Sequence, residues 1–203
     1  MIVNLEQGSQ EWLDYRRSKF NASETPILFG RGFSSVEQLA NEKLGLRKNY
    51  LSFLDSKHNL TEREAKILLA VKKGQVTEES IRSLINKKYS MNFVPVVLMD
   101  DTDNRFSASL DGYDKKYNAV LEIKTSLNTY NEILKKKRVS DAYIYQCYHQ
   151  LMVSRAKQLL FVAGYIDDSF ELKLSSAILK PNEAVFKAIR DKWNAFERDY
   201  LRF

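Results

Sequence analysis

Apolar and polar residues alternate along the middle of the chain in a way that predicts β-strands. Residues 92–99 are almost entirely apolar and read as a strand, and Pro95 indicates a sheet edge or a bulge because proline cannot donate to a hydrogen-bond ladder. Residues 107–111 and 119–125 read as two further strands, joined by a polar, turn-like stretch. These last two segments predict a β-hairpin.

Helical periodicity dominates most of the remaining chain. Helices are predicted over residues 10–19, 23 onward, 34–44, 61–73, 75–88, 141–155 and 181–200. Residues suited to the first positions of a helix begin most of them: Ser9, Ser23, Thr61, Ser140 and Pro181. Gly74 is expected to interrupt a helix, and residues 46–60 are expected to form a loop. Residues 158–166 predict a strongly apolar strand, with which residues 170–174 pair.

The composition limits the classes of protein to which the chain can belong. Its 203 residues, 44% of them hydrophobic and 29% charged, suit one globular domain with its own core. No apolar run approaches the roughly 20 residues of a membrane span, and the N-terminus has no signal-peptide pattern. The single cysteine, Cys147, excludes an internal disulfide and a cysteine-based metal cluster. We therefore expect a cytoplasmic protein, whose net charge of +6 permits a polyanionic partner without requiring one.

The predicted hairpin carries residues that could bind a metal ion and act in catalysis. Asp111 lies on its first strand, and Glu122 and Lys124 share one face of the second. Pairing would bring Asp111 next to Glu122, and two such carboxylates repel unless a cation lies between them. Mg²⁺ prefers carboxylate, water and substrate oxygens, and a nearby lysine can hold the attacking water or stabilise charge on a phosphate. Taken alone the pattern is common, and an ordinary edge hairpin with a surface Glu–Lys pair explains it better.

Two other places have both a structural and a functional interpretation. Arg16 and Arg17 suit a helix C-terminus and Ser23 a helix N-terminus, yet a serine at a helix N-terminus facing an arginine also forms a phosphate site. Glu78 and Glu79 suit the first turn of the predicted helix 75–88, where acids interact favourably with the helix dipole. The functional alternative is a third carboxylate at a metal site.

The densest basic run contains Lys135, Lys137 and Arg138. It is either a solvated loop or helix end, or a contact with a nucleic-acid backbone, and its place between the hairpin and the next helix favours the second interpretation. In that next helix the periodicity points Gln146 inward. His149 has too few companions for a metal site, so we interpret it as a surface or internally satisfied histidine.

These features together resemble a known group of nucleases. The predicted order of helices, three strands, a helix and a strand matches the PD-(D/E)XK nuclease superfamily, and within it the chain resembles the YqaJ-like, lambda-type phage exonucleases over nearly its whole length. The resemblance rests on Gln7-Gly-Ser-x-Glu-Trp-Leu-x-x-Arg16-Arg17 followed by Ala22-Ser23, on Gly74-x-x-x-Glu78, on Leu110-Asp111-Gly112 with Leu121-Glu122-Ile123-Lys124, and on Tyr145-Gln146-x-x-His149-Gln150-Leu151.

The resemblance implies an α/β fold with a restriction-endonuclease-like core, in which helices flank a mixed central sheet and an N-terminal helical part is added. Residues 1–203 would form a single nuclease domain, mainly helical over 1–90, with the sheet core and the C-terminal helix in 91–203. Leu110 occupies the position where the family often has proline. This difference matters little, because that proline binds neither metal nor substrate.

The resemblance also implies a metal site. Asp111, Glu122 and the carbonyl of Ile123 would bind Mg²⁺, for which Mn²⁺ would substitute. Glu78 would support the same metal or a second one.

Further roles follow for the residues around that site. Lys124 would orient or activate the attacking water, and Gln146 would position that lysine or the substrate. Arg16 and Ser23 would hold the 5′-phosphate end of the DNA, with the adjacent Arg17 as the alternative arginine.

The implied activity is metal-assisted removal of 5′ nucleotides from linear double-stranded DNA in phage-type recombination, inside a bacterial or phage-infected cell. The implied partners are a single-strand annealing protein and further copies of the chain in a ring-shaped trimer. Alternatives are an endonuclease, resolvase or flap-trimming nuclease on the same fold, or an inactive DNA-binding module. The iron–sulfur branch of the superfamily needs four cysteines, so the single cysteine argues against it. A sequence-specific restriction enzyme has no support either, because no segment predicts its recognition helix.

Overall fold

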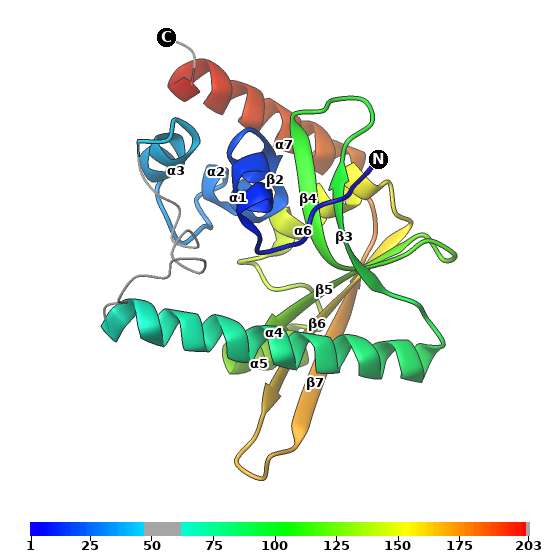
Figure 1. The fold of residues 1–203 in the computed structure, drawn as a ribbon. Helices are drawn as coiled ribbons and strands as arrows, with labels where there is room; N and C mark the ends of the chain where they lie inside the picture. The colour runs from blue at the N-terminus through cyan, green and yellow to red at the C-terminus, as the bar shows by residue number, and fades with distance from the viewer. Residues whose placement is uncertain (47–61, 202–203) are drawn as a thin grey trace.

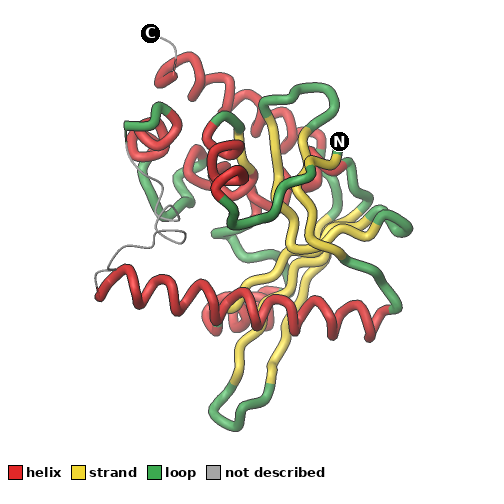
Figure 2. Tube along the Cα trace, viewed as in Figure 1, coloured by secondary structure: helices red, strands yellow, loops and turns green. Residues whose placement is uncertain are grey.

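The computed structural model describes residues 1–46 and 62–201, with side chains from Gly74 onward in the second part. Its centre is one mixed sheet of seven strands (Figures 1 and 2). Along the sheet the order is β1 (Ile2–Val3), β3 (Val94–Met99), β4 (Phe106–Asp114), β5 (Ala119–Thr125), β6 (Gln158–Ile166) and β7 (Leu172–Leu179), while β2 (Phe20–Asn21) pairs with β4. The β5–β6 and β2–β4 pairs are parallel, and the others are antiparallel.

Helices cover both faces of this sheet (Figure 1). They are α1 (Gln10–Arg17), α2 (Thr25–Leu28), α3 (Val36–Lys43), α4 (Glu62–Tyr89), α5 (Leu127–Lys136), α6 (Ile144–Ser154) and α7 (Glu183–Phe196), with a 3₁₀ turn at Ala22–Glu24 and a π-helical turn at Glu197–Leu201. The predicted mixed α/β architecture is therefore confirmed. Among the described residues, none of the helices is both long enough and apolar enough to cross a membrane.

The alternation of side chains along β5 explains how the sheet joins its two helical layers. Val120 belongs to the larger core cluster, as does Leu151 of α6, whereas Leu121 belongs to the smaller one, as does Ile81 of α4. Consecutive residues of a strand face opposite sides of the sheet, so a single strand contributes to both cores. Glu122 is directed to the α6 side by the same alternation.

Helix α4 corrects one prediction. Gly74 does not interrupt it, because the helix runs without a break from Glu62 to Tyr89. One glycine costs a helix only about 1 kcal/mol, and a Cβ at this position would lie 3.5 Å from Oγ1 of Thr125, at the end of β5. The predicted cap at Thr61 and nearly all of the predicted loop 46–60 lie outside the described residues.

Two further predictions about helix starts are wrong. Ser140 does not cap α6, which begins at Ile144; its hydroxyl instead donates a 2.5 Å hydrogen bond to Glu132 of α5. Pro181 precedes the N-cap of α7, which is Asn182, whose side chain accepts from the next turn's backbone N–H groups. In both cases a competing polar partner determined where the helix begins.

Ser23 is not a cap either. It lies inside the 3₁₀ turn, where Asn21 and Glu24 form a capping box. The prediction of Ser9 as the N-cap of α1 is confirmed, as is the irregularity at Pro95, where the β3–β4 register shifts. The predicted strand at 170–174 is in fact the longer β7, paired antiparallel with β6 along its length.

Candidate active site

The β4–β5 hairpin brings the two carboxylates of the sequence motif together. Gly112 is paired with Leu121, so the next position along each strand places Asp111 beside Glu122. Oδ2 of Asp111 accepts a 2.7 Å hydrogen bond from the backbone N–H of Ile123. The predicted pairing of Asp111 with Glu122 is therefore present, and the side chain of Asp111 is held at the point where β4 and β5 diverge.

Glu122 is buried and is held by three donors. Its Oε1 accepts from Nε2 of Gln146 at 2.6 Å, and its Oε2 accepts from Nε2 of Gln150 at 2.5 Å. Nζ of Lys124 lies 2.5 Å from Oε1. A buried carboxylate needs such compensation because its desolvation is costly. The two glutamines are one turn apart on α6, so one helix face fixes the orientation of the carboxylate.

Lys124 is a permanently charged group in this arrangement. Burial alone would lower the pKa of its ammonium, but the negative charges of Glu122 and Asp111 outweigh that effect and raise the pKa. The ammonium also lies 4.9 Å from the ring centroid of Tyr143, a cation–π contact. Lys124 is consequently suited to stabilise negative charge or to orient a water rather than to accept a proton.

The environment of Asp111 disfavours its charged form, whereas that of Lys124 favours the charged form. Burial raises its pKa well above the usual range, and the neighbouring charge of Glu122 adds to the shift. A divalent cation between the two carboxylates would relieve this repulsion. Carboxylate and carbonyl oxygens are also the donors that Mg²⁺ and Mn²⁺ prefer, so the residues present fit such an ion.

Glu78 lies in the middle of α4, and this removes the alternative explanation of its position. Because α4 begins at Glu62, Glu78 is far from the helix N-terminus, where the dipole acts. Burial raises its pKa, and the charge of Glu122 contributes to the rise, which places both carboxylates in one electrostatic environment.

Arg82 joins α4 to the hairpin. Its Nη1 lies 3.3 Å from Oε1 of Glu78 and donates a 3.0 Å hydrogen bond to the carbonyl of Asp111. Within the part of the chain with described side chains, no three histidine, cysteine, aspartate or glutamate residues are grouped closely enough to hold a metal as they stand. Glu78 is directed to Arg82 here, so its place in a metal site stays a prediction.

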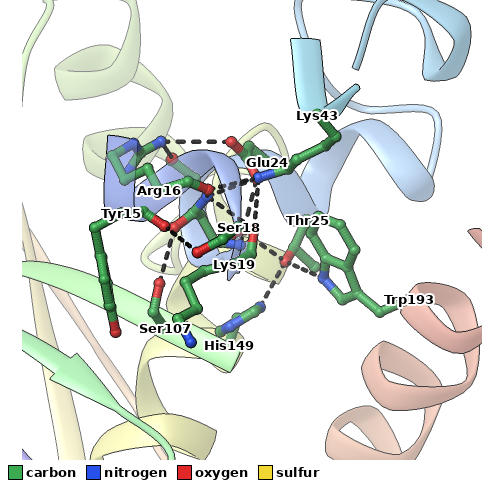
Figure 3. Close-up of polar contacts among 12 residues, drawn as sticks. Tyr15, Arg16, Ser18, Lys19, Glu24, Thr25, Lys43, Ser107, His149 and Trp193 are labelled. Carbon is green, nitrogen blue, oxygen red and sulfur yellow. Dashed lines mark hydrogen bonds and ion pairs between the residues drawn. The ribbon is translucent and has the colours of Figure 1, made fainter. Parts of the chain in front are cut away.

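A second polar cluster is centred on Arg16, at the end of α1 (Figure 3). Its Nη2 donates a 2.9 Å hydrogen bond to Oγ of Ser23, and its guanidinium lies 4.6 Å from the Trp12 ring centroid. The adjacent Arg17 is instead exposed and bonded to Asp14. Of the two arginines left open by the sequence, Arg16 is the one that faces Ser23.

Lys43 of α3 ties this cluster together, and the sequence did not predict it. Its ammonium is buried, contacts Glu24 at 2.7 Å and donates to the carbonyls of Arg16 and Lys19 (Figure 3). Burial lowers its pKa, and the charge of Glu24 opposes that shift. Glu24 also lies 3.7 Å from Arg16, so it holds both cations.

One cavity is lined by residues that contact both clusters. It has a volume of about 490 Å³ and is lined by Arg16 and Ser23 as well as by Tyr143 and Gln146. The last two residues contact Lys124 and Glu122, respectively. The cavity thus adjoins both the arginine–serine pair and the carboxylate–lysine cluster.

The basic run at the end of α5 forms its own ion pairs. Lys136 contacts Glu132 and Asp141, and Arg138 contacts Asp141, which lowers the pKa of that aspartate. Lys135 and Lys137 are exposed. Arg138 is therefore already partnered, and the two lysines are the members of the run most available to a phosphate backbone.

The mixed sheet, with an Asp on one strand and Glu-x-Lys on the next, defines a nuclease-type α/β fold. The chain belongs to the YqaJ-like viral recombinase domain family, whose model matches residues 11–157. The structure is similar to an alkaline exonuclease from Laribacter hongkongensis, with 18% identity, a TM-score of 0.70, and coverage of 95% of this chain and 92% of that one.

A second similar structure is a phage-related exonuclease from Haemophilus somnus, with 13% identity, a TM-score of 0.62, and coverage of 90% of this chain and 93% of that one. At such identities these likenesses show the fold. A search of curated proteins found no match.

Proposed function

We propose that this protein is a metal-dependent deoxyribonuclease that removes nucleotides in the 5′-to-3′ direction from the ends of linear double-stranded DNA. The observation that carries the proposal is the cavity shared by Arg16, Ser23 and Gln146, because it adjoins both a phosphate-binding pair and the carboxylate cluster. Its structural neighbours are an alkaline exonuclease, also solved in complex with dAMP, and a phage-related exonuclease.

In this proposal Asp111, Glu122 and the carbonyl of Ile123 bind Mg²⁺ or Mn²⁺, and Glu78 supports that ion or a second one after turning from Arg82. A divalent ion at such a site supplies Lewis-acid stabilisation of the phosphate and lowers the pKa of a bound water.

The remaining chemistry belongs to the protein's own side chains. Lys124, held as an ammonium, orients the water and stabilises charge developing on the scissile phosphate. Gln146 and Gln150 keep the Glu122 carboxylate in one orientation. Arg16 and Ser23 hold the terminal 5′-phosphate by charge-assisted hydrogen bonds.

The resemblance to the family supports a proposal about the wider setting. The substrate is double-stranded DNA, and Lys135, Lys137 and Arg138 contact its backbone in the proposed complex. A single-strand annealing protein is the proposed partner, and a ring-shaped trimer is the proposed assembly. We place the activity in the cytoplasm of a bacterial or phage-infected cell.

The test compares a linear duplex carrying a 5′-phosphate with the same DNA closed into a circle, in Mg²⁺ or in EDTA. Loss of the linear form alone, in Mg²⁺ alone, with a 3′ single strand remaining, is the expected result. Cleavage of the circle would make the protein an endonuclease on this fold. DNA binding without cleavage of either substrate would make it an inactive binding module.

A further inference from the structure

Phe33 is an aromatic residue whose side chain is exposed to solvent. It lies in the loop between α2 and α3, and 89% of its surface is exposed. It also lines the cavity that contains Arg16, Ser23 and Tyr143. Single exposed apolar residues are common on protein surfaces and need no explanation. Phe33, however, lies beside the proposed active site.

The loop that carries Phe33 is tightly built. Gly30 has a φ of +65°, and its N–H donates to the carbonyl of Ile27. A Cβ at Gly32 would lie only 2.3 Å from Cγ1 of Ile27 and 2.8 Å from its Cα, so no other residue fits there without a shift of the backbone. The loop is thus packed directly against α2 at Gly32, the residue immediately before Phe33.

Phe33 contributes little to the folded core. Its closest aromatic neighbour is Tyr143, at a centroid separation of 6.5 Å and an interplanar angle of 51°, which is no stacked contact. Tyr143 in turn lies against the ammonium of Lys124. The loop therefore places an exposed phenyl ring near Tyr143, which contacts the lysine proposed for catalysis.

The cavity has the size and the chemistry of a nucleotide site. Its volume of about 490 Å³ lies within the usual range of about 300–1,000 Å³ for small-molecule sites. A terminal nucleotide with its 5′-phosphate at Arg16 would extend along the cavity toward Gln146, the residue that donates to Glu122, so its 3′-side phosphate would lie toward the carboxylates. The sugar and phosphates then have polar partners, and the base needs an apolar surface.

We propose that Phe33 stacks on the base of the 5′-terminal nucleotide and so holds that nucleotide between the two phosphate-binding clusters. This inference rests on the proposed function, because it takes the positions of both phosphates from it. Stacking on an aromatic ring is worth about 1–3 kcal/mol per base and tolerates any base. Phe33 is accordingly a positioning residue that acts without sequence preference.

The experiment uses two 5′-phosphorylated duplexes that differ only in the terminal nucleotide, which carries adenine in one and lacks a base in the other. Single-turnover release of the first nucleotide is measured against enzyme concentration for the wild type and for Phe33→Ala. We expect Phe33→Ala to raise the half-saturating enzyme concentration about 5- to 150-fold on the normal duplex, the equivalent of that stacking energy. On the abasic duplex we expect almost no change.

Two matched variants complete the design. Phe33→Trp keeps an aromatic face and should retain wild-type behaviour on both duplexes. Phe170→Ala removes an equally exposed phenylalanine, 91% accessible, from the tip of the β6–β7 hairpin, which projects away from the site (Figure 1), and should change nothing. The inference is overturned if Phe33→Ala has no effect, or if it weakens both duplexes by the same factor.

Failure of the proposed function would be seen separately. The wild type alone, on 5′-phosphate and 5′-hydroxyl ends, tests whether ends are recognised through phosphate. If the wild type cleaves neither duplex, equilibrium binding is measured instead. The dissociation constants of wild type and Phe33→Ala, each with the normal and the abasic duplex, then test whether Phe33 stacks on the base. Equal affinities of wild type and Phe33→Ala for the normal duplex would then reject it.

Discussion

Gln150 donates a 2.5 Å hydrogen bond to Oε2 of Glu122, although the two residues lie on different elements, α6 and β5. Both are buried, so the hydrogen bond is formed away from competing water. Gln146 restrains the other oxygen from the previous turn of the same helix. Helix α6 therefore determines the orientation of the Glu122 carboxylate.

The first prediction is that Gln150→Ala weakens metal binding. Loss of an outer hydrogen bond to a metal ligand typically lowers metal affinity or activity about 10- to 100-fold. The Mg²⁺ concentration for half-maximal cleavage should rise by such a factor, with the 5′-end preference retained. Gln158→Ala is the control, because Gln158 only pairs with Lys180 at the surface. An unchanged Mg²⁺ requirement in Gln150→Ala would remove Gln150 from the site.

The second prediction concerns Lys124. Lys124→Ala should lower cleavage by at least about 10²-fold, the usual effect of removing one charge-stabilising donor, while DNA affinity stays nearly the same. Single-turnover cleavage and equilibrium binding of the same duplex measure the two effects. Lys115→Ala, an exposed lysine in the turn of the same hairpin, should cleave normally. Wild-type cleavage rates in Lys124→Ala would contradict its catalytic assignment.

The hairpin could be predicted from sequence because its signal is local. Alternating apolar residues at Leu121 and Ile123 determine which way Glu122 points, and the short polar turn fixes its pairing with the strand of Asp111. The partners of Glu122 on α6 depend on packing over 24 and 28 residues of sequence separation. The helical period indicates the inward direction of Gln146, and it puts Gln150, one turn later, on the same predicted stripe.

The mistaken helix boundaries have the opposite cause. At Gly74 a local preference against helix was overridden by the long flanking helix. At Ser140 the hydroxyl found a non-local acceptor in Glu132. Lys43 lies in the last turn of α3, where a basic residue suits the helix dipole, and only the folded chain brings Glu24 to it. Sequence patterns do not encode such non-local polar contacts.

The third prediction uses the two adjacent arginines. Arg16→Ala should reduce the preference for 5′-phosphorylated over 5′-hydroxyl ends by about 10-fold or more, because a charged hydrogen bond to phosphate is worth about 1.5–3 kcal/mol. Arg17→Ala should leave that ratio unchanged, since Arg17 is exposed and paired with Asp14. Rates on the two kinds of end, measured side by side, give the ratio. If both variants showed the same ratio of rates on the two kinds of end, Arg16 would not be the residue that recognises the 5′-phosphate.

The fourth prediction concerns the buried pair of Lys43 and Glu24. Lys43→Met should lower the free energy of unfolding by about 1–3 kcal/mol, because it leaves a largely buried carboxylate with less compensation. The double variant Lys43→Met/Glu24→Gln should recover part of this loss, since neither charge then remains. Urea unfolding of the four proteins of this cycle measures the coupling. If the two single losses simply add, the pair is not coupled.

The fifth prediction is a pH dependence of stability due to His149. This side chain is fully buried, with Nδ1 2.6 Å from Oγ1 of Thr25, and burial, with the positive charge of Arg190, lowers its pKa to about 3. The unfolded chain has a histidine pKa near 6.5 and so binds more protons than the folded chain between about pH 3 and 6.5. The neutral histidine therefore stabilises the fold fully above about pH 6.5, and this contribution is lost as the pH falls.

The slope for one such group is at most about 1.4 kcal/mol per pH unit. Urea unfolding of the wild type and of His149→Gln at several pH values between 7.5 and 5 isolates it, because most carboxylates titrate below this window. The difference in stability between the two proteins should shrink as the pH falls, since the glutamine does not titrate. A constant difference across the window would mean that the histidine has an ordinary pKa in the folded protein.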